Sequence, residues 1–559
     1  MIHLQIFLAK NNNRNIVYLI GIIALQITAY FYIKPHIINS DDIAYINSAL
    51  SMIEGSYKFT PSVFTQRFLV FLPVSLLYRL FGVNIYSSTV HLLMFAIFHT
   101  IIIYYLGNKI KNGMGILAAL LFGLNPLTLF LTVELLPDLI CSTFILVALY
   151  FLYSSEEDTK TNKKRFHGFL FSAFLFLSIL AKENIMFYLP FFLFICIRSY
   201  RLNYKFWNTA FLTFAALILL LGLFYKMQTG YFFYKLSAIE SEHNLSVWSY
   251  QYASGSSLLK RVIFGLYYLL LGDSSLVLLT VLIAPLLFSI RNMIKEKSLR
   301  FWIYNFLFLL VIYQYGSTSL KSYNPIPLIP RMFFCLLPPM CLLAGYSMQE
   351  IISNKRNKWI YIMLITSAVS AMVCIQVYHL SKTTLICTLV IFTTSLLAIL
   401  VNNTRLKILI LFFPVIFIFV YSANNLRTNT DITKETYDNY IGKLPYNSIV
   451  IMNDRSILAN KYYNFNNSNQ LMFIDWANIE KVSVLPSQKG KPVYLLIDYK
   501  EVQSLHVSYN EYIPKFINSR PSDWKAIKEY NLYDIVKKNN VKSLGLYKIN
   551  SLEELRNNY

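Results

Sequence analysis

Residues 16–33 read IVYLIGIIALQITAYFYI, and after KPHIINS the chain reaches the acidic stretch DDIAYINSA at residues 41–49. The first run has 18 residues without a charge, close to the roughly 20 apolar residues that cross a bilayer as a helix. Lys10 and Arg14 precede it and no small-residue cleavage motif follows it, which argues against a signal peptide. We therefore predict a first membrane-spanning helix that starts in the cytoplasm and is followed by two carboxylates on the outer face.

The rest of the chain repeats this apolar pattern. Of its 559 residues, 56% are hydrophobic and 14% are charged, whereas a soluble domain carries about 25% charged residues. This composition excludes an ordinary soluble protein. With the first run, the apolar segments predict about 13 transmembrane helices, the others lying at residues 85–106, 114–132, 138–153, 167–181, 184–198, 207–225, 274–290, 301–316, 331–349, 358–378, 383–401 and 406–423.

The basic residues report the topology of the chain. It has 50 Lys and Arg against 28 Asp and Glu, a net charge of +22 that resembles a nucleic-acid footprint. With a cytoplasmic N-terminus, however, the connections before residue 424 hold 20 basic residues inside and 12 outside, as the positive-inside rule requires. The acidic residues show the opposite bias, with 5 inside and 9 outside. The charge therefore indicates a multi-pass protein of the cytoplasmic membrane with no nucleic-acid partner.

An odd number of spans places the C-terminal tail outside the cytoplasm. We divide the chain into a transmembrane domain, residues 1–424, and a soluble extracytoplasmic domain, residues 425–559. The predicted fold class is mainly α, polytopic in the membrane, with a small α/β domain at the C-terminus. All six cysteines precede the tail and lack metal-finger spacing, so they are expected to be small apolar core residues. In the tail we expect strands at residues 448–452 and 492–498 and helices at residues 525–530 and 534–539.

The first outer loop, residues 34–84, carries the strongest signal for chemistry. Asp41 and Asp42 fall in the first turn of an expected surface helix, with Ser40 as its cap. The helix dipole favours ionised carboxylates at this position. The apolar residues that recur at helical spacing in this segment are Ile43, Ile46, Leu50 and Ile53.

Basic residues follow in the same loop and on the same predicted face. Residues 65–84 are apolar enough to lie in the membrane interface, yet they carry Arg67 and Arg79. An arginine at headgroup depth binds a lipid phosphate in a forked geometry. The other charged residues that gather on this face are Glu134, Asp138, Lys182, Lys321 and Arg331.

Several chemistries lack their motifs. The chain has no phosphate loop ending in Gly-Lys-Ser/Thr, no GxGxxG, no HExxH and no GxSxG. An Asp-x-Asp pair, which many enzymes use to hold a nucleotide-sugar with its metal, is also absent. Nucleotide recognition is therefore not visible in the sequence.

A set of short motifs follows in a fixed order along the chain. They are Asp41-Asp42-Ile43-Ala44-Tyr45, Leu80-Phe81-Gly82-Val83-Asn84, Glu134-Leu135-Leu136-Pro137-Asp138, Lys182 before a helix with Pro190, and Arg331-Met332-Phe333-Phe334 before Pro338-Pro339. Together they resemble the GT-C superfamily of integral-membrane glycosyltransferases, most of all the branch that contains the protein O-mannosyltransferases and the aminoarabinose transferase of lipid A. The resemblance covers roughly residues 10–425. The chain departs from the family with Asp42 where Glu is common, and with Arg67 where Lys before paired prolines is frequent.

The resemblance implies transfer of a sugar from a polyprenyl-phosphate carrier to a glycan, lipid or protein acceptor on the outer face. Membrane lipids would surround the enzyme, and no cofactor is required. Asp41 would be the general base, and Asp42 would orient the acceptor or hold a divalent metal ion as in some relatives. Asp138 would be a second carboxylate near the sugar. Arg67, Lys182 and Arg331 would contact the phosphate, with Glu134, Arg79 and Lys321 as further candidates.

Other classes of membrane protein remain open at this point. A flippase or transporter of lipid-linked oligosaccharides should carry its charges inside helices near the bilayer midplane. An O-antigen polymerase would share the lipid-linked substrate but place its large outer loop mid-chain. A receptor would bind a ligand through its tail, in which no catalytic constellation is visible. There Asp454, Asp475 and Asp498 are expected to end strands and not to bind metal.

Overall fold

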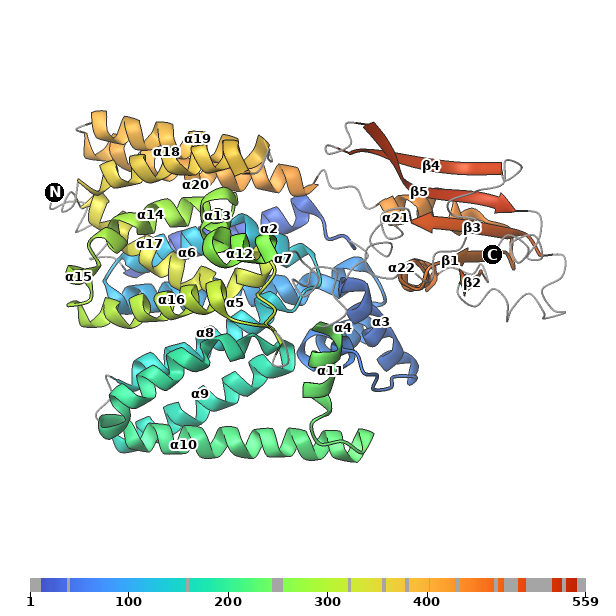
Figure 1. The fold of residues 1–559 in the computed structure, drawn as a ribbon, viewed down its shortest axis with the longest axis horizontal. Helices are drawn as coiled ribbons and strands as arrows, with labels where there is room; N and C mark the ends of the chain where they lie inside the picture. The colour runs from blue at the N-terminus through green and yellow to red at the C-terminus, as the bar shows by residue number, and fades with distance from the viewer. Residues whose placement is uncertain are drawn as a thin grey trace.

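The computed structural model describes residues 12–37, 41–156, 160–243, 255–319, 323–353, 358–377, 382–401, 403–427, 432–466, 471–476, 491–498, 525–534 and 539–549. A bundle of helices is followed by a five-stranded sheet with two helices, which lies at one end of the bundle (Figure 1). The mainly α fold with a small C-terminal α/β unit is therefore confirmed. Ser40 and Lys321 lie outside the described residues.

The first half of the bundle contains α2 (Asn12–Ile33), α3 (Asp41–Glu54), η1 (Val63–Gln66), α4 (Phe68–Phe81), α5 (Ile85–Ile110), α6 (Met114–Gly123), α7 (Pro126–Val133), α8 (Asp138–Ser155), α9 (Thr161–Ala181), η2 (Glu183–Tyr188), α10 (Leu189–Thr229) and α11 (Tyr234–His243). The second half contains α12 (Gly255–Lys260), η4 (Arg261–Gly265), α13 (Leu266–Gly272), α14 (Val277–Phe288), α15 (Ile290–Met293), α16 (Lys297–Tyr315), η5 (Pro330–Leu336), α17 (Leu337–Ile352), α18 (Trp359–Val377), α19 (Lys382–Leu400) and α20 (Thr404–Arg427).

Every predicted membrane segment falls on helices, but the number of spans differs. Among the described residues, eight helices are long and apolar enough to cross a membrane, or up to ten if two bent pairs each count as one span. In the first pair, α6 and α7 meet at 53° where Asn125 caps α7 and Pro126 starts it. The second pair, residues 255–272 with α14, bends by 111°. The count of 13 is not confirmed, because apolar length alone does not show where a helix breaks.

The longest helix, α10, is two antiparallel arms. Asn203 has non-helical backbone angles, φ −126° and ψ 27°, in its interior. Trp207 Nε1 donates a hydrogen bond to Ser199 Oγ at 3.0 Å, although eight residues of straight helix would span about 12 Å. Phe171 of α9 likewise contacts both Phe192 and Phe206. The chain therefore reverses at Asn203, so the one long helix holds both predicted segments, residues 184–198 and 207–225.

Small residues let helices of the bundle approach closely. At the α5–α6 turn, a β-carbon on Gly107 would lie 2.6 Å from the Cα of Gly115, so any larger residue would force the two helices apart. Gly345 of α17 faces Ala118 of α6, where a β-carbon would lie 3.0 Å from the Ala118 nitrogen. The most deeply buried helix is α17, in which every residue is buried.

The tail adds α21 (Ile432–Asn439), η6 (Ile441–Lys443), β1 (Ile449–Met452), α22 (Asp454–Asn464), β2 (Met472–Asp475), β3 (Val493–Asp498), β4 (Lys525–Asp534) and β5 (Asn539–Ile549). The strand order is β2-β1-β3-β5-β4, with β1 parallel to both β2 and β3, and β5 antiparallel to β3 and β4. Asp475 and Asp498 end strands as predicted, whereas Asp454 begins α22.

The helix predicted at residues 525–530 is wrong, because residues 525–534 form β4, which pairs with β5. Of the helix predicted at residues 534–539, residue 534 ends β4 and residue 539 begins β5, and the residues between them lie outside the described part of the chain. The helical expectation rested on local propensity, but the hydrogen bonds that decide this segment join it to a strand later in the chain. Tertiary pairing overrides propensity here. The predicted strands at residues 448–452 and 492–498 match β1 and β3.

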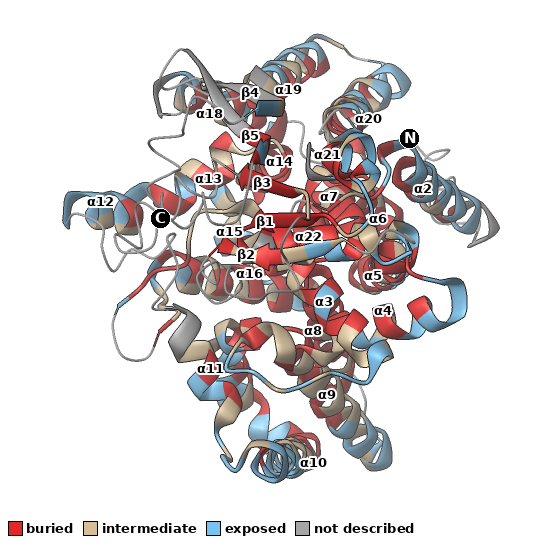
Figure 2. Ribbon diagram, turned by 90° about the vertical axis from the view of Figure 1, so that its right-hand side faces the viewer, coloured by how far each residue is buried: buried red, intermediate tan, exposed pale blue. Residues whose placement is uncertain are grey.

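Helix α22 joins the sheet to the bundle. Its Ile457 packs in the apolar cluster of the sheet, while Ala459 and Tyr462 belong to the core of the helical part. The hydroxyl of Tyr462 is 3.3 Å from Ser88 Oγ of α5, and Asn466 donates to the carbonyl of Val83. Figure 2, which looks onto the sheet end, shows α22 beside the buried strands β1 and β2. The division of the chain at residue 424 stays a prediction.

Candidate active site

Asp41 begins α3 and forms an ion pair with Arg331, which lies 290 residues later in η5. Arg331 Nη2 donates to Asp41 Oδ2 at 2.8 Å, and the Asp41 side chain is 34% exposed. Burial by itself would raise the pKa of Asp41, but the charges of Arg331, and further those of Arg67 and Lys182, outweigh it and hold that pKa below 3.8. Asp41 is thus an ionised carboxylate that water still reaches.

A second ion pair lies beside the first and is almost completely buried from solvent. Lys182 Nζ is 2.6 Å from Asp138 Oδ1, with the lysine side chain 9% exposed and the aspartate fully buried. Lys182 Nζ also lies 3.5 Å from the sulfur of Met332, the neighbour of Arg331. The start of α8, the end of α9 and η5 therefore meet at one point. The second oxygen of Asp138 has no hydrogen-bond partner in the described structure.

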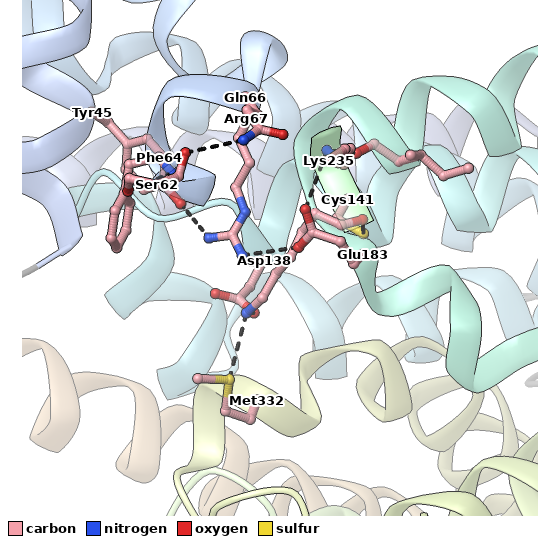
Figure 3. A network of polar contacts seen from close by, with 12 residues as sticks. Tyr45, Ser62, Phe64, Gln66, Arg67, Asp138, Cys141, Glu183, Lys235 and Met332 are labelled. Carbon is pink, nitrogen blue, oxygen red and sulfur yellow. Dashed lines mark hydrogen bonds and ion pairs between the residues drawn. The ribbon is translucent and has the colours of Figure 1, made fainter. Parts of the chain in front are cut away.

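A third cluster of polar contacts joins the first outer loop, residues 34–84, to η2 and α11 (Figure 3). Arg67, between η1 and α4, donates to the hydroxyl of Tyr45 at 2.6 Å and to Glu183 Oε2 at 2.9 Å. Lys235 of α11 approaches the other oxygen, Glu183 Oε1, at 3.2 Å. Tyr45 lies one turn after Asp41 on α3. Residues 182 and 183 thus serve different partners, the lysine toward Asp138 and the glutamate toward Arg67.

Glu134 is buried and pairs with His36. Its Oε1 is 3.2 Å from His36 Nε2. Burial raises the pKa of Glu134, and the hydrogen bond from His36 only partly opposes this shift. The charge of Arg331 also acts on Glu134, so the pair borders the cluster around Asp41.

The remaining predicted residues have other positions. Asp42 is buried, at 1% exposure, and its Oδ1 accepts a hydrogen bond from the Ile43 amide, so the adjacent aspartates occupy unlike environments. Arg79 is not brought to the cluster. It lies twelve residues after Arg67, about 18 Å along α4, and its guanidinium is 3.5 Å from the Met52 carbonyl.

Sequence reasoning missed three residues that shape the site. Lys235 supplies a cation, and Tyr45 orients Arg67. Arg261, 2% exposed, donates to the carbonyls of Tyr313 and Ile326 at 2.9 Å, which fixes the proline-rich segment leading to Arg331. A lysine in the run YFFYK, residues 231–235, was a readable signal, because this run falls on the predicted outer face, where cations are less common.

The residues around Asp42 do not form a metal site by themselves. Among the described residues, no three His, Cys, Asp or Glu side chains come together so as to hold a metal ion. The carboxylates of Asp41, Glu134, Asp138 and Glu183 are each engaged by an arginine, lysine or histidine.

Comparison with known proteins identifies the fold. No protein-family model matches the chain, and no curated protein does. Among solved structures, ArnT from Cupriavidus metallidurans bound to undecaprenyl phosphate superimposes with a TM-score of 0.62, covering 96% of this chain and 98% of ArnT at 12% identity. The chain has the ArnT fold. ArnT in its apo state gives a TM-score of 0.57, covering 95% of this chain and 97% of ArnT at 12% identity.

The ArnT fold extends over both the helical bundle and the tail, because the match covers nearly all of both chains. It confirms the fold class that the sequence motifs predicted.

Proposed function

We propose that this protein is a membrane glycosyltransferase that moves a sugar from a polyprenyl-phosphate carrier to an acceptor at the outer face of the cytoplasmic membrane. One observation carries the proposal: the described chain gathers the cations Arg67, Lys182 and Arg331 with the carboxylates Asp41 and Asp138 at one end of the bundle. ArnT, whose fold the chain shares, has been solved with undecaprenyl phosphate bound, which supports a polyprenyl phosphate as the carrier.

The geometry suits a single displacement at the anomeric carbon. Asp41 would accept the proton of the acceptor hydroxyl, whose oxygen then bonds to the sugar carbon as the bond from that carbon to the phosphate oxygen breaks. The leaving phosphate carries its own negative charge and needs no general acid, unlike the alcohol released by a glycosidase. Such a displacement inverts the anomeric centre.

The cations would stabilise the charge that the leaving phosphate gains. Arg331 is paired with Asp41, so a phosphate that attracts Arg331 would also free the carboxylate. Asp138, fully buried with one oxygen unpartnered among the described residues, would accept a hydrogen bond from a sugar hydroxyl. Asp42 would hold the start of α3 and help to orient the acceptor.

The direct test is a transfer assay with purified protein in detergent. Radiolabelled sugars on polyprenyl phosphate would be offered with lipid A, a surface polysaccharide and a peptide as acceptors. Transfer to one of them supports the proposal, and mass spectrometry of surface glycans from a deletion strain should then show loss of the same sugar. An intact glycan profile together with no transfer to any acceptor would refute it.

The ion pair between Asp41 and Arg331 predicts a pH effect. The reaction needs the ionised carboxylate, so activity is lost as the pH falls through the pKa of Asp41, which the cations hold below 3.8. In Arg331→Met one of the positive charges that lower the pKa of Asp41 is gone, so burial raises this pKa. The acid limb of the pH profile of kcat/KM should therefore move to higher pH. Arg331→Lys should keep the wild-type limb. A limb that stays in place in Arg331→Met would show that Asp41 is not the titrating base.

A further inference from the structure

Lys235 is a buried cation that has no role in the mechanism proposed above. It is the second residue of α11 and is 7% exposed. Its ammonium donates to the Ile179 carbonyl at 2.9 Å and lies 3.2 Å from Glu183 Oε1. An ammonium has three donors, and the described residues supply partners for two of them. Taking such a charge out of water is unfavourable unless other groups compensate it, so its position calls for a compensating role.

The charges around Lys235 do not balance. Arg331 with Asp41 and Lys182 with Asp138 are one-to-one pairs. Glu183, in contrast, is shared by Arg67 and Lys235, so this trio carries one surplus positive charge. The Nε of Arg67 is also buried and without a hydrogen-bond partner in the described structure. Unused donors and surplus charge therefore occur at the same place.

We propose that Lys235 is a fourth cation that contacts the phosphate of the lipid-linked donor, and that the trio of Arg67, Glu183 and Lys235 binds this phosphate through its surplus charge. The proposal rests on the function proposed above. The sugar-bearing phosphodiester carries one negative charge, which the trio neutralises. After transfer the phosphate monoester carries up to two negative charges, and Lys182 and Arg331 would share the second.

The position of Lys235 supports its assignment as a contact of the phosphate. Figure 3 shows Lys235 reaching Glu183 from the side opposite Arg67, so the two cations flank one carboxylate. Helix α11 packs against both η1 and α10, which brings the lysine from a separate outer segment to the loop that carries Arg67. The alternative is a purely structural role, in which Lys235 only neutralises Glu183 and ties α11 to the end of α9.

The two roles predict different results when Glu183 is changed. Lys235→Met leaves the trio with no net charge, Glu183→Gln leaves two positive charges, and the double variant restores one. If Lys235 contacts the phosphate, the affinity for the phosphate should increase with the net positive charge of the trio. If it is only the counter-ion of Glu183, the two single variants should weaken binding alike, because each breaks the same pair.

The experiment measures binding of undecaprenyl phosphate to the purified full-length protein in detergent, at two salt concentrations. Lys235→Met is expected to weaken binding about 10- to 100-fold, the range for a hydrogen bond to a charged group, and to reduce the salt dependence. Lys235→Arg should stay close to wild type, Glu183→Gln should bind at least as tightly, and the double variant should recover most of the loss. Lys226→Met, which removes an exposed lysine near the end of α10, is the matched control and should not change affinity.

The outcomes separate this inference from the proposed function. Wild-type protein that does not bind undecaprenyl phosphate contradicts the function itself. Wild-type binding with equal affinity in Lys235→Met, or equal losses in Lys235→Met and Glu183→Gln, overturns the role of Lys235 and leaves the function intact. If size-exclusion chromatography shows that Lys235→Met is not folded, Lys235→Arg and Glu183→Gln still test the proposal. Tighter or unchanged binding of undecaprenyl phosphate by Glu183→Gln supports the role of the surplus charge, and weaker binding overturns it.

Discussion

Replacing Asp41 by Asn is expected to lower the rate of sugar transfer about 10²- to 10⁴-fold, the contribution of a general base in the transition state. The change removes the only proton-accepting oxygen that we assign to the reaction while keeping the shape of the side chain. Binding of the donor should persist or tighten, because Arg331 loses its partner Asp41 and becomes available to the phosphate. The loss should therefore appear in kcat and not in KM, measured with a saturating acceptor.

The matched control for this prediction lies on the same helix. Glu54→Gln removes a carboxylate from the last residue of α3, where the side chain is exposed, and should leave transfer unchanged. Full activity in Asp41→Asn, with the variant shown to be folded and inserted, would exclude Asp41 as the base.

Lys182→Met is expected to destabilise the protein by about 3–5 kcal/mol, the cost of leaving a buried charge without its partner. Asp138 is fully buried and Lys182 Nζ, at 2.6 Å, is the one cation paired with it among the described residues. Thermal unfolding in detergent should show the loss as a lower midpoint. The double variant Asp138→Asn with Lys182→Met should recover much of it, because both charges are then absent.

Two further measurements make the stability prediction specific. Lys58→Met removes an exposed lysine from the first outer loop and should leave the midpoint unchanged. A double variant as unstable as Lys182→Met alone would mean that the lysine stabilises the fold through its stem and not through its charge.

Local patterns predicted the elements that carry the site. The spacing of Ile43, Ile46 and Leu50 predicted α3, and these residues are buried in it. The charged residues Asp41, Asp138 and Lys182 were chosen because they fall at the ends of apolar runs on one predicted face. Each of these signals lies within about ten residues, which is why it can be read from sequence.

What could not be predicted is the pairing between distant segments. Nothing local links Arg331 to Asp41, or Arg67 to Glu183, since these contacts depend on how the bundle folds. The same reason explains the strand β4, which forms by pairing with β5. The reversal at Asn203, in contrast, falls between the segments predicted at residues 184–198 and 207–225. The prediction that Arg79 belongs to the site is not supported, because α4 places this residue away from the cluster.

The position of α22 makes the two parts of the chain thermodynamically interdependent. Because Tyr462 is buried in the core of the bundle and Ile457 in the core of the sheet, neither core is complete without this helix. Its contact with α3 links the tail to the helix that bears the proposed base. We therefore expect melting of the sheet to loosen α3, which carries the proposed base Asp41, as well.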